Sequence, residues 1–326
     1  MRLMLGLALA VIALFVAALL IGPAGLGVRQ SLGALIAGGD DPLALVMREI
    51  RLPRAILAVA IGASLGLAGA AMQGYLRNPL AEPGLIGVSA SAALGAVLAI
   101  QTGLAAAFAL ALPAAALLGA LVGVVLVTML AGPGAASLAL ILAGIAVSAL
   151  AGALTSLVLN LSPNPYAANE IVFWMMGSLA DRSMLHVWVA LPFMVVGWAL
   201  LASTGRGLQA LTLGEDAAAA MGIDLVRLRR TVVLGTACVV GAGTAVAGAI
   251  GFVGLVVPHI LRPLVGAHPG RLLWASALGG AVMLLAADIA VRVVLPARDL
   301  KLGVLTALVG APLFLHLIFK LRRGEA

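Results

Sequence analysis

Long runs of apolar residues, separated by glycine, proline and short charged clusters, follow one another along the chain. The run 104–131 holds no charged residue, and about 20 such residues let one helix cross the hydrocarbon core of a bilayer. Only 10% of all residues are charged, whereas soluble domains have about 25%. The runs are too long for the strands of an outer-membrane barrel, which have about ten residues of alternating polarity. We therefore predict an all-α polytopic membrane protein in which residues 1–326 form a single transmembrane domain.

Hydropathy and turn residues predict ten transmembrane helices. The eighth is interrupted by Gly251, Gly254 and Pro258, which favours a broken or half-length helix. A signal peptide is the alternative for the first, but that run is nearly long enough to span and lacks a small-residue cleavage site. The predicted spans are 3–23, 53–74, 85–101, 104–131, 138–160, 185–203, 231–249, 251–266, 273–295 and 303–320.

Positive charges predict how the chain lies in the membrane. The two ends and the even-numbered connections carry 11 of the 19 Lys and Arg residues, and the opposite side carries eight. Basic residues are enriched on the cytoplasmic side, so we expect both termini in the cytoplasm. The net charge of +7 then reflects orientation and lipid headgroups. Nucleic acid is not an expected partner, because no aromatic platform for stacking bases accompanies the charge.

Some kinds of chemistry are excluded by residues that the sequence lacks. A single cysteine, Cys238, can form neither a disulfide framework nor a cysteine-ligated metal cluster. A nucleotide-binding P-loop needs a lysine after a glycine-rich turn, but neither Lys301 nor Lys320 follows a glycine. We therefore expect no metal site, no cofactor and no ATP-hydrolysing site on this chain.

Two segments of the chain are alike. Residues 51–54 (Arg-Leu-Pro-Arg) and 227–230 (Arg-Leu-Arg-Arg) each precede a helix rich in small residues, and the two helices are predicted to run in opposite directions. An inverted internal repeat of this kind is common in transporters. The match is short, so chance composition is the alternative explanation.

A series of motifs resembles the FecCD-type permease family, which imports iron chelates, haem and cobalamin. The series begins with Arg51-Leu-Pro-Arg54, Gln73 and the run 77–89 (Arg-Asn-Pro-Leu-Ala-Glu-Pro-Gly-Leu-Ile-Gly-Val-Ser). The family's remaining landmarks follow in order, so the resemblance covers nearly the whole chain. They are Leu142-Ala-Gly144, Phe173-Trp-Met-Met-Gly-Ser178, the stretch 248–262, Ala287-Asp288 and Gly310-Ala-Pro-Leu-Phe-Leu315.

This resemblance implies the permease subunit of a type II ATP-binding cassette importer. Members have ten helices, pair as a homodimer or pseudo-dimer around a central path, and bind two cytoplasmic ATPase subunits. A periplasmic binding protein delivers their substrate, which here would be a metal chelate such as haem, a ferric siderophore or cobalamin. The implied location is the bacterial inner membrane. ATP and magnesium would then belong to the partner ATPase.

Three arginines are candidates for docking the binding protein. Arg51, Arg54 and Arg292 are predicted at the outer ends of the second and ninth helices, where cations should be rare. The resemblance implies that they receive acidic residues of the binding protein, and guanidinium groups do form directional pairs with carboxylates. Headgroup anchoring or helix capping is the alternative. The segment 299–302 (Asp-Leu-Lys-Leu) departs from the family's usual sequence, so we expect an outer gate of different shape there.

Residues 204–230 contain the segment expected to contact the ATPase. Gly214 and Gly222 are predicted to bound a short helix with acidic residues in its first turn. The resemblance implies that this coupling helix lies in a cleft of the ATPase, and an ordinary amphipathic connection is the alternative. The candidate coupling residues are Gly214, Glu215, Asp216, Ala217, Ala218, Met221 and Gly222.

A rigid turn is predicted near the cytoplasmic face at Asn78, Pro79, Glu82 and Pro83, because each proline fixes its own φ and restricts the preceding residue. Its role is mainly structural, and Glu82 is a candidate partner for Arg77 or the ATPase.

Polar residues inside a predicted span are functional candidates by default. His259 and Asp288 are such residues, although His259 follows Pro258 and could satisfy backbone groups that the proline frees. Met175 and Met176 are interpreted as packing residues.

The main alternative function is a secondary transporter driven by protons or sodium. It would need intramembrane carboxylates, and the middle of the predicted spans offers almost none besides Asp288. An intramembrane enzyme would need a nucleophile with a base, or paired carboxylates, but Asp40 and Asp41 fall in an outer loop. The predicted function is therefore an importer permease, and the sequence leaves the chelate open.

Overall fold

The computed structural model describes residues 2–22, 30–31, 33–34, 41–132, 137–294 and 300–322, and these ranges contain helices and no strand. Asp40 and Asp299, to which the sequence drew attention, lie outside them. The main helices are α1 (Arg2–Leu20), α4 (Leu52–Tyr75), α5 (Val88–Gln101), α7 (Ala111–Ala131), α8 (Ser137–Asn160), α10 (Met184–Ser203), α13 (Leu225–Ala247), α14 (Val253–Leu261), α15 (Pro269–Val294) and α16 (Leu302–Arg322).

Shorter elements connect these helices or lie at their ends. They are α3 (Pro42–Leu45), a π-helical turn η1 (Val46–Arg51), η2 (Pro83–Ile86), α6 (Leu104–Ala107), α9 (Pro165–Met175), α11 (Gly205–Leu211), α12 (Glu215–Ala220) and η3 (Pro263–Val265).

Each predicted span corresponds to one of the ten main helices, but not all of them are full spans. Within the described ranges, seven helical stretches are long and apolar enough to cross a membrane, and α5 and the Leu302–His316 part of α16 are shorter apolar helices. The remaining one, α14, has nine residues, as the predicted half-length helix requires.

The fourth predicted span, 104–131, was wrong in its first part. The chain is extended at Phe108 and turns there, so α6 ends and α7 begins at Ala111. Pro113 lies in the first turn of α7. A proline has no N–H to donate and its ring crowds the carbonyl four residues earlier, so it fits the first turn of a helix and favours a helix start just before it.

The helix α9 was not predicted either. Asn164 accepts a hydrogen bond from the Tyr166 N–H at 3.0 Å, and Pro165 occupies the first position of the helix. Both are ordinary helix-start signals, and they were available in the sequence.

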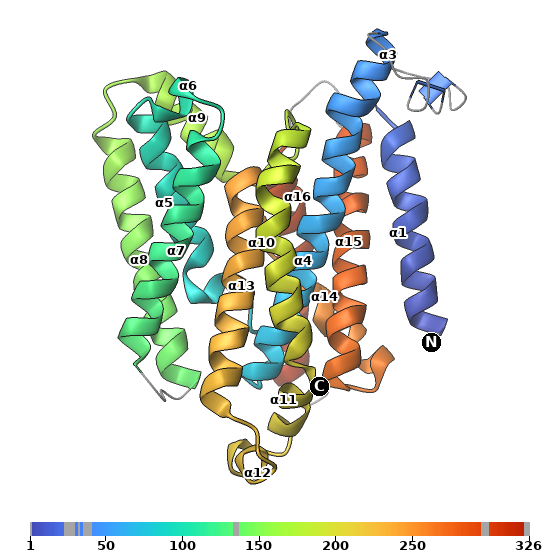
Figure 1. Ribbon diagram of the computed structural model, residues 1–326, viewed down its shortest axis with the longest axis vertical. Helices are drawn as coiled ribbons and strands as arrows, with labels where there is room; N and C mark the ends of the chain where they lie inside the picture. The colour runs from blue at the N-terminus through green and yellow to red at the C-terminus, as the bar shows by residue number, and fades with distance from the viewer. Residues whose placement is uncertain are drawn as a thin grey trace.

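The helices form two groups joined by α10 and α13 (Figure 1). One group contains α5, α7 and α8, and the other contains α1, α4 and α15. The short helix α12 lies beyond one end of the bundle, and the same end holds the start of α1 and the end of α16. The helices α4 and α13 run in opposite directions, as an inverted repeat requires.

The backbone of α4 touches the backbones of its neighbours. A Cβ added at Gly66 would lie 1.9 Å from the Ser276 carbonyl oxygen of α15, and one added at Gly69 would lie 1.9 Å from the Gly254 carbonyl oxygen of α14. Small residues allow this closeness, which maximises van der Waals contact where lipid supplies no hydrophobic drive for helices to associate. Most of the stretch Pro42–Tyr75 is therefore buried.

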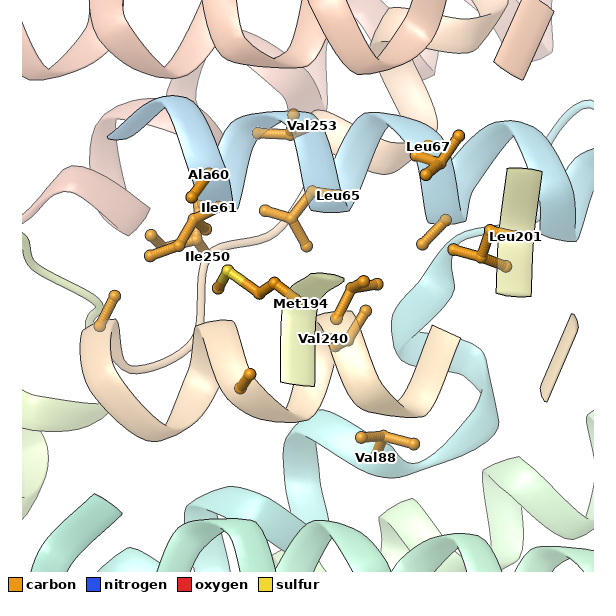
Figure 2. Close-up of a cluster of buried hydrophobic side chains, with 14 of the residues drawn as sticks. Ala60, Ile61, Leu65, Leu67, Val88, Met194, Leu201, Val240, Ile250 and Val253 are labelled. Atoms are coloured by element: carbon orange, nitrogen blue, oxygen red, sulfur yellow. The ribbon is translucent and has the colours of Figure 1, made fainter. Parts of the chain in front are cut away.

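The other side of α4 packs through side chains. Figure 2 shows Ile61 and Leu65 of α4 pointing toward α13, where Val240 faces them, with Met194 of α10 between the two helices. Ile61, Met194 and Val240 are all buried. This layer fixes α4 between α15 and α13, the two helices that carry the sites described below.

Gly66→Ala is expected to lower the melting temperature of the protein in detergent. The new methyl group meets backbone, which cannot rotate away, and overpacking costs about 1–3 kcal/mol. Alanine gains at most about 1 kcal/mol in helix propensity over glycine, so the clash dominates. Gly6→Ala in α1 is the matched control, since nothing lies within 4 Å of its Cβ position. An unchanged melting temperature for Gly66→Ala would contradict the contact.

Candidate functional site

A cluster of charged side chains lies where α4 begins and α15 ends, and its centre is Asp288. Arg54 Nε donates a hydrogen bond to Asp288 Oδ1 at 2.8 Å, and Arg292 Nη2 donates to Asp288 Oδ2 at 2.5 Å. Asp288 is fully buried. Both of its oxygens are thus used by guanidinium groups, one on α4 and one a helical turn away on α15.

The same cluster holds the C-terminal end of α1. Arg51 Nη1 donates to the carbonyls of Leu19 and Leu20 at 2.8 and 3.0 Å. Arg292 Nη1 donates to the carbonyls of Ala18 and Ile21 at 2.8 and 2.9 Å. The last carbonyls of a helix have no partner within it and carry the negative end of its dipole, so two guanidinium groups complete this end of α1.

The structure brings the three predicted docking arginines together, but they are largely buried. Arg51 is 4% exposed, and the side chains of Arg292 and Arg54 are 7% and 17% exposed. Helix capping, the alternative weighed above, is a role that Arg51 and Arg292 do have. Docking stays a prediction, and Arg54 is the most accessible of the three. The spacing of Asp288 and Arg292, four residues apart on one helix, was a sequence signal for their ion pair.

The predicted turn after α4 connects to the start of α14. Asn78 Oδ1 accepts from the Leu80 N–H at 2.9 Å within the turn. Glu82 Oε1 accepts from the Phe252 N–H at 2.9 Å. Phe252 precedes α14 with a positive φ of 68°, so the carboxylate caps a strained helix start. Pro83 is buried in η2. Of the two partners suggested for Glu82, the structure does not show Arg77, whose ion pair is with Glu215, and the ATPase stays a prediction.

Arg77 is directed to the coupling segment instead. Its Nη2 lies 3.8 Å from Glu215 Oε1 of α12, with both side chains half exposed. The turn after α4 is therefore in contact with both α14 and α12. An ion pair at this exposure contributes little to stability, and its importance is that it relates the two segments in space.

Gln73 of α4 satisfies the broken helix α14. Pro258 has no N–H, so the carbonyl of Gly254 loses its helical donor. Gln73 Nε2 lies 3.5 Å from the Gly254 oxygen and donates to the Leu255 oxygen at 3.1 Å, while its Oε1 accepts from Arg262 Nη2 at 2.8 Å. The sequence had suggested His259 for the backbone groups that Pro258 frees. Gln73, on the neighbouring helix α4, also lies close to the Gly254 carbonyl.

The predicted coupling helix is confirmed as a helix. Gly214 and Gly222, with φ of 104° and 83°, bound α12, because glycine adopts such angles without strain. Glu215 and Asp216 occupy its first turn. Ala218 faces its own chain and is fully buried, whereas Met221 is 62% exposed. Figure 1 shows this helix projecting beyond α11 and α13, so it presents an apolar surface outside the bundle.

An apolar groove of about 580 Å³ runs along α16. Met175 and Met176 at the end of α9 line it together with Ala249 and residues of α16. Within the described ranges no three His, Cys, Asp or Glu side chains group as a metal site. The groove therefore offers shape and soft apolar contact, and both methionines lie on its surface, with Met176 exposed.

Comparison with known proteins places these features in a family. The profile of the FecCD transport family matches residues 9–320. The chain is 40% identical to the cobalamin import system permease protein BtuC of Halobacterium salinarum over 86% of its length and 75% of the relative's. It is 36% identical to the Fe(3+) dicitrate transport system permease protein FecD of Escherichia coli over 85% of its length and 86% of the relative's.

A solved structure has the same fold along nearly the whole chain. It is an inward-facing metal-chelate type ABC transporter, with 34% sequence identity and a TM-score of 0.86 over 98% of this chain and 99% of that one. The all-α importer-permease fold expected from the sequence is confirmed by this match.

Asp288→Asn is expected to lower the melting temperature strongly. Breaking a buried ion pair by removing one partner costs about 3–5 kcal/mol, because it leaves an uncompensated buried charge. Two arginines lose their counter-charge here. Glu49→Gln is the control, since Glu49 is an exposed carboxylate in η1 near the same end. The double variant Asp288→Asn/Arg54→Gln should lose less than the sum of the single losses. Strictly additive losses would contradict the pairing.

Proposed function

This chain belongs to the FecCD transport family, and we propose that two copies of it enclose the path by which a metal chelate crosses the bacterial inner membrane. It is a multi-pass permease subunit of an ATP-binding cassette importer, as its relatives are. The observation that carries this conclusion is the family match over residues 9–320. The match includes the charged cluster, the turn after α4 and the segment containing α12.

The proposed substrate class is a metal chelate. The relatives are named for import of cobalamin and ferric dicitrate, which differ in metal, size and charge. A path for an intact chelate needs shape more than ligands, because the chelator already satisfies the metal. The apolar groove along α16 is suited to that role, with two methionines that can adapt to different outlines. Haem, ferric siderophores and cobalamin all remain within the proposed class.

The proposed energy source is ATP on partner subunits. The lysines of this chain do not form a P-loop, and α12 offers an exposed surface outside the bundle. A secondary transporter would need a carboxylate that is free to bind its coupling ion. Asp288 is the buried carboxylate of the described ranges, and both of its oxygens already accept hydrogen bonds from guanidinium groups. The ion-gradient alternative therefore lacks a site there.

The proposed cycle is alternating access. A loaded binding protein docks at the Asp288 cluster, ATP binding moves the two ATPase subunits together, and their motion reaches the path through α12. The contacts Arg77–Glu215 and Glu82–Phe252 lie on a route from α12 to α14. With α12 on the ATPase side, that end of the bundle is cytoplasmic, and so are both termini. A second copy would cover the exposed apolar side chains of α16, such as Leu308 and Leu315.

Arg54→Gln is expected to weaken the affinity of the binding protein by about tenfold and to reduce its dependence on salt concentration, because the coupling energy of a close interfacial charge pair is about 1.5 kcal/mol or more. Surface plasmon resonance on the purified complex measures both quantities. Arg48→Gln is the matched control, because Arg48 is an exposed arginine of η1 near the same end. Equal affinities for the two variants would remove Arg54 from docking.

Met221→Asp is expected to separate the permease from its ATPase, because it places a charge on the exposed apolar surface of α12. Co-purification of the ATPase with tagged permease is the readout. Met221→Leu keeps size and polarity and should retain the ATPase. Normal co-purification and ATP-driven uptake with Met221→Asp would contradict the coupling role.

A further inference from the structure

A cavity of about 380 Å³ lies where α7 ends and where α8 and α13 begin. Its walls are largely aliphatic and include Leu140, Val233 and Leu234. Arg229 and Arg230 of α13 line the same cavity, and the described lining contains no carboxylate. The cavity thus combines two fixed positive charges with an apolar interior, and none of the functions above uses it.

The two arginines are adjacent residues in the second turn of α13. Arg229 Nη2 donates to the Gly132 carbonyl at 3.1 Å, at the end of α7. Arg230 is exposed. Arginine forms bidentate hydrogen bonds with planar or tetrahedral oxyanions, so two adjacent guanidinium groups at one cavity suit a phosphate group.

The position of the cavity indicates where that anion comes from. Ala131 ends one apolar helix and Ser137 begins the next, so the cavity is level with the boundary between hydrocarbon and headgroups. Leu234, beside Arg230, is exposed on the surface that α13 presents there. A soluble acidic peptide would leave the aliphatic walls without a partner. An amphiphile with an anionic head and an acyl chain matches both the charges and the walls.

We propose that this cavity binds an anionic phospholipid, whose phosphate pairs with Arg229 and Arg230 and whose acyl chain lies along Leu140, Val233 and Leu234. Basic pockets between membrane helices are suited to such headgroups. The site lies at the end of the bundle that carries α12 (Figure 1). Only the assignment of this end to the cytoplasmic leaflet of the membrane rests on the proposed function. A lipid bound here would join α7 to α13 next to the coupling segment.

The test uses the purified permease alone, so that its outcome is separate from that of the ATPase and binding-protein experiments. Native mass spectrometry and melting temperature are recorded with phosphatidylglycerol, with phosphatidylcholine and with inorganic phosphate. The wild type should retain phosphatidylglycerol about 25-fold better than phosphatidylcholine, since each arginine near an anionic headgroup contributes about fivefold. Arg230→Gln should lose about fivefold of this preference.

Two further variants separate the cavity from general surface charge. Arg227→Gln removes an exposed arginine of the same helix that does not line the cavity, and it should keep the preference. Ala131→Phe fills the cavity without changing charge and should lose bound lipid.

Equal retention of the two lipids by the wild type would overturn the proposal, and so would an equal loss with Arg227→Gln. Stabilisation by inorganic phosphate as large as that by phosphatidylglycerol would overturn the lipid assignment. Unchanged lipid preference in Arg230→Gln would overturn the pairing of the phosphate with this arginine.

Discussion

Inside a bilayer every backbone polar group and every charge must find its partner within the protein, because lipid supplies none, and α4 is the helix through which this chain meets that requirement. Near its first turn Arg54 pairs with Asp288. In its middle Gly66 lets α4 touch the backbone of α15. Near its last turn Gln73 reaches the carbonyls of α14. The helices α14 and α15 are therefore positioned by one neighbour, and so are the polar groups they carry.

This arrangement relates the two ends of the molecule. The charged cluster joins α1, α4 and α15 at one end, and the turn after α4 contacts α14 and α12 at the other. Arg77 and Glu82 lie in the same short turn, so the contact with α12 and the contact with the start of α14 are close together. Capping contacts at Leu19 and Leu20 tie α1 to the same frame. A rigid helix with partners at both ends is a physical link between the charged cluster and the turn beside α12.

The sequence predicted the parts that depend on neighbouring residues. Hydropathy located the helices because each apolar run is long, and α12 was located because Gly214 and Gly222 permit backbone angles that other residues disfavour. The inward direction of the docking arginines was not predictable in the same way. Arg54 and Asp288 are 234 positions apart, and no local pattern relates them. The pairing of Gln73 with Leu255, across 182 positions, depends equally on the tertiary fold. By contrast, α9 and the break before Pro113 had local signals that the hydropathy argument passed over.

The account holds that this chain provides a path while ATP, hydrolysed elsewhere, provides the energy. Reconstitution of the permease with its ATPase and binding protein in vesicles tests this most directly, with labelled haem, ferric siderophore and cobalamin offered in turn on the binding-protein side. The account predicts accumulation of at least one of these chelates only when ATP is present on the ATPase side, regardless of the proton or sodium gradient. Accumulation driven by an ion gradient in vesicles that hold the permease without any ATPase would contradict it.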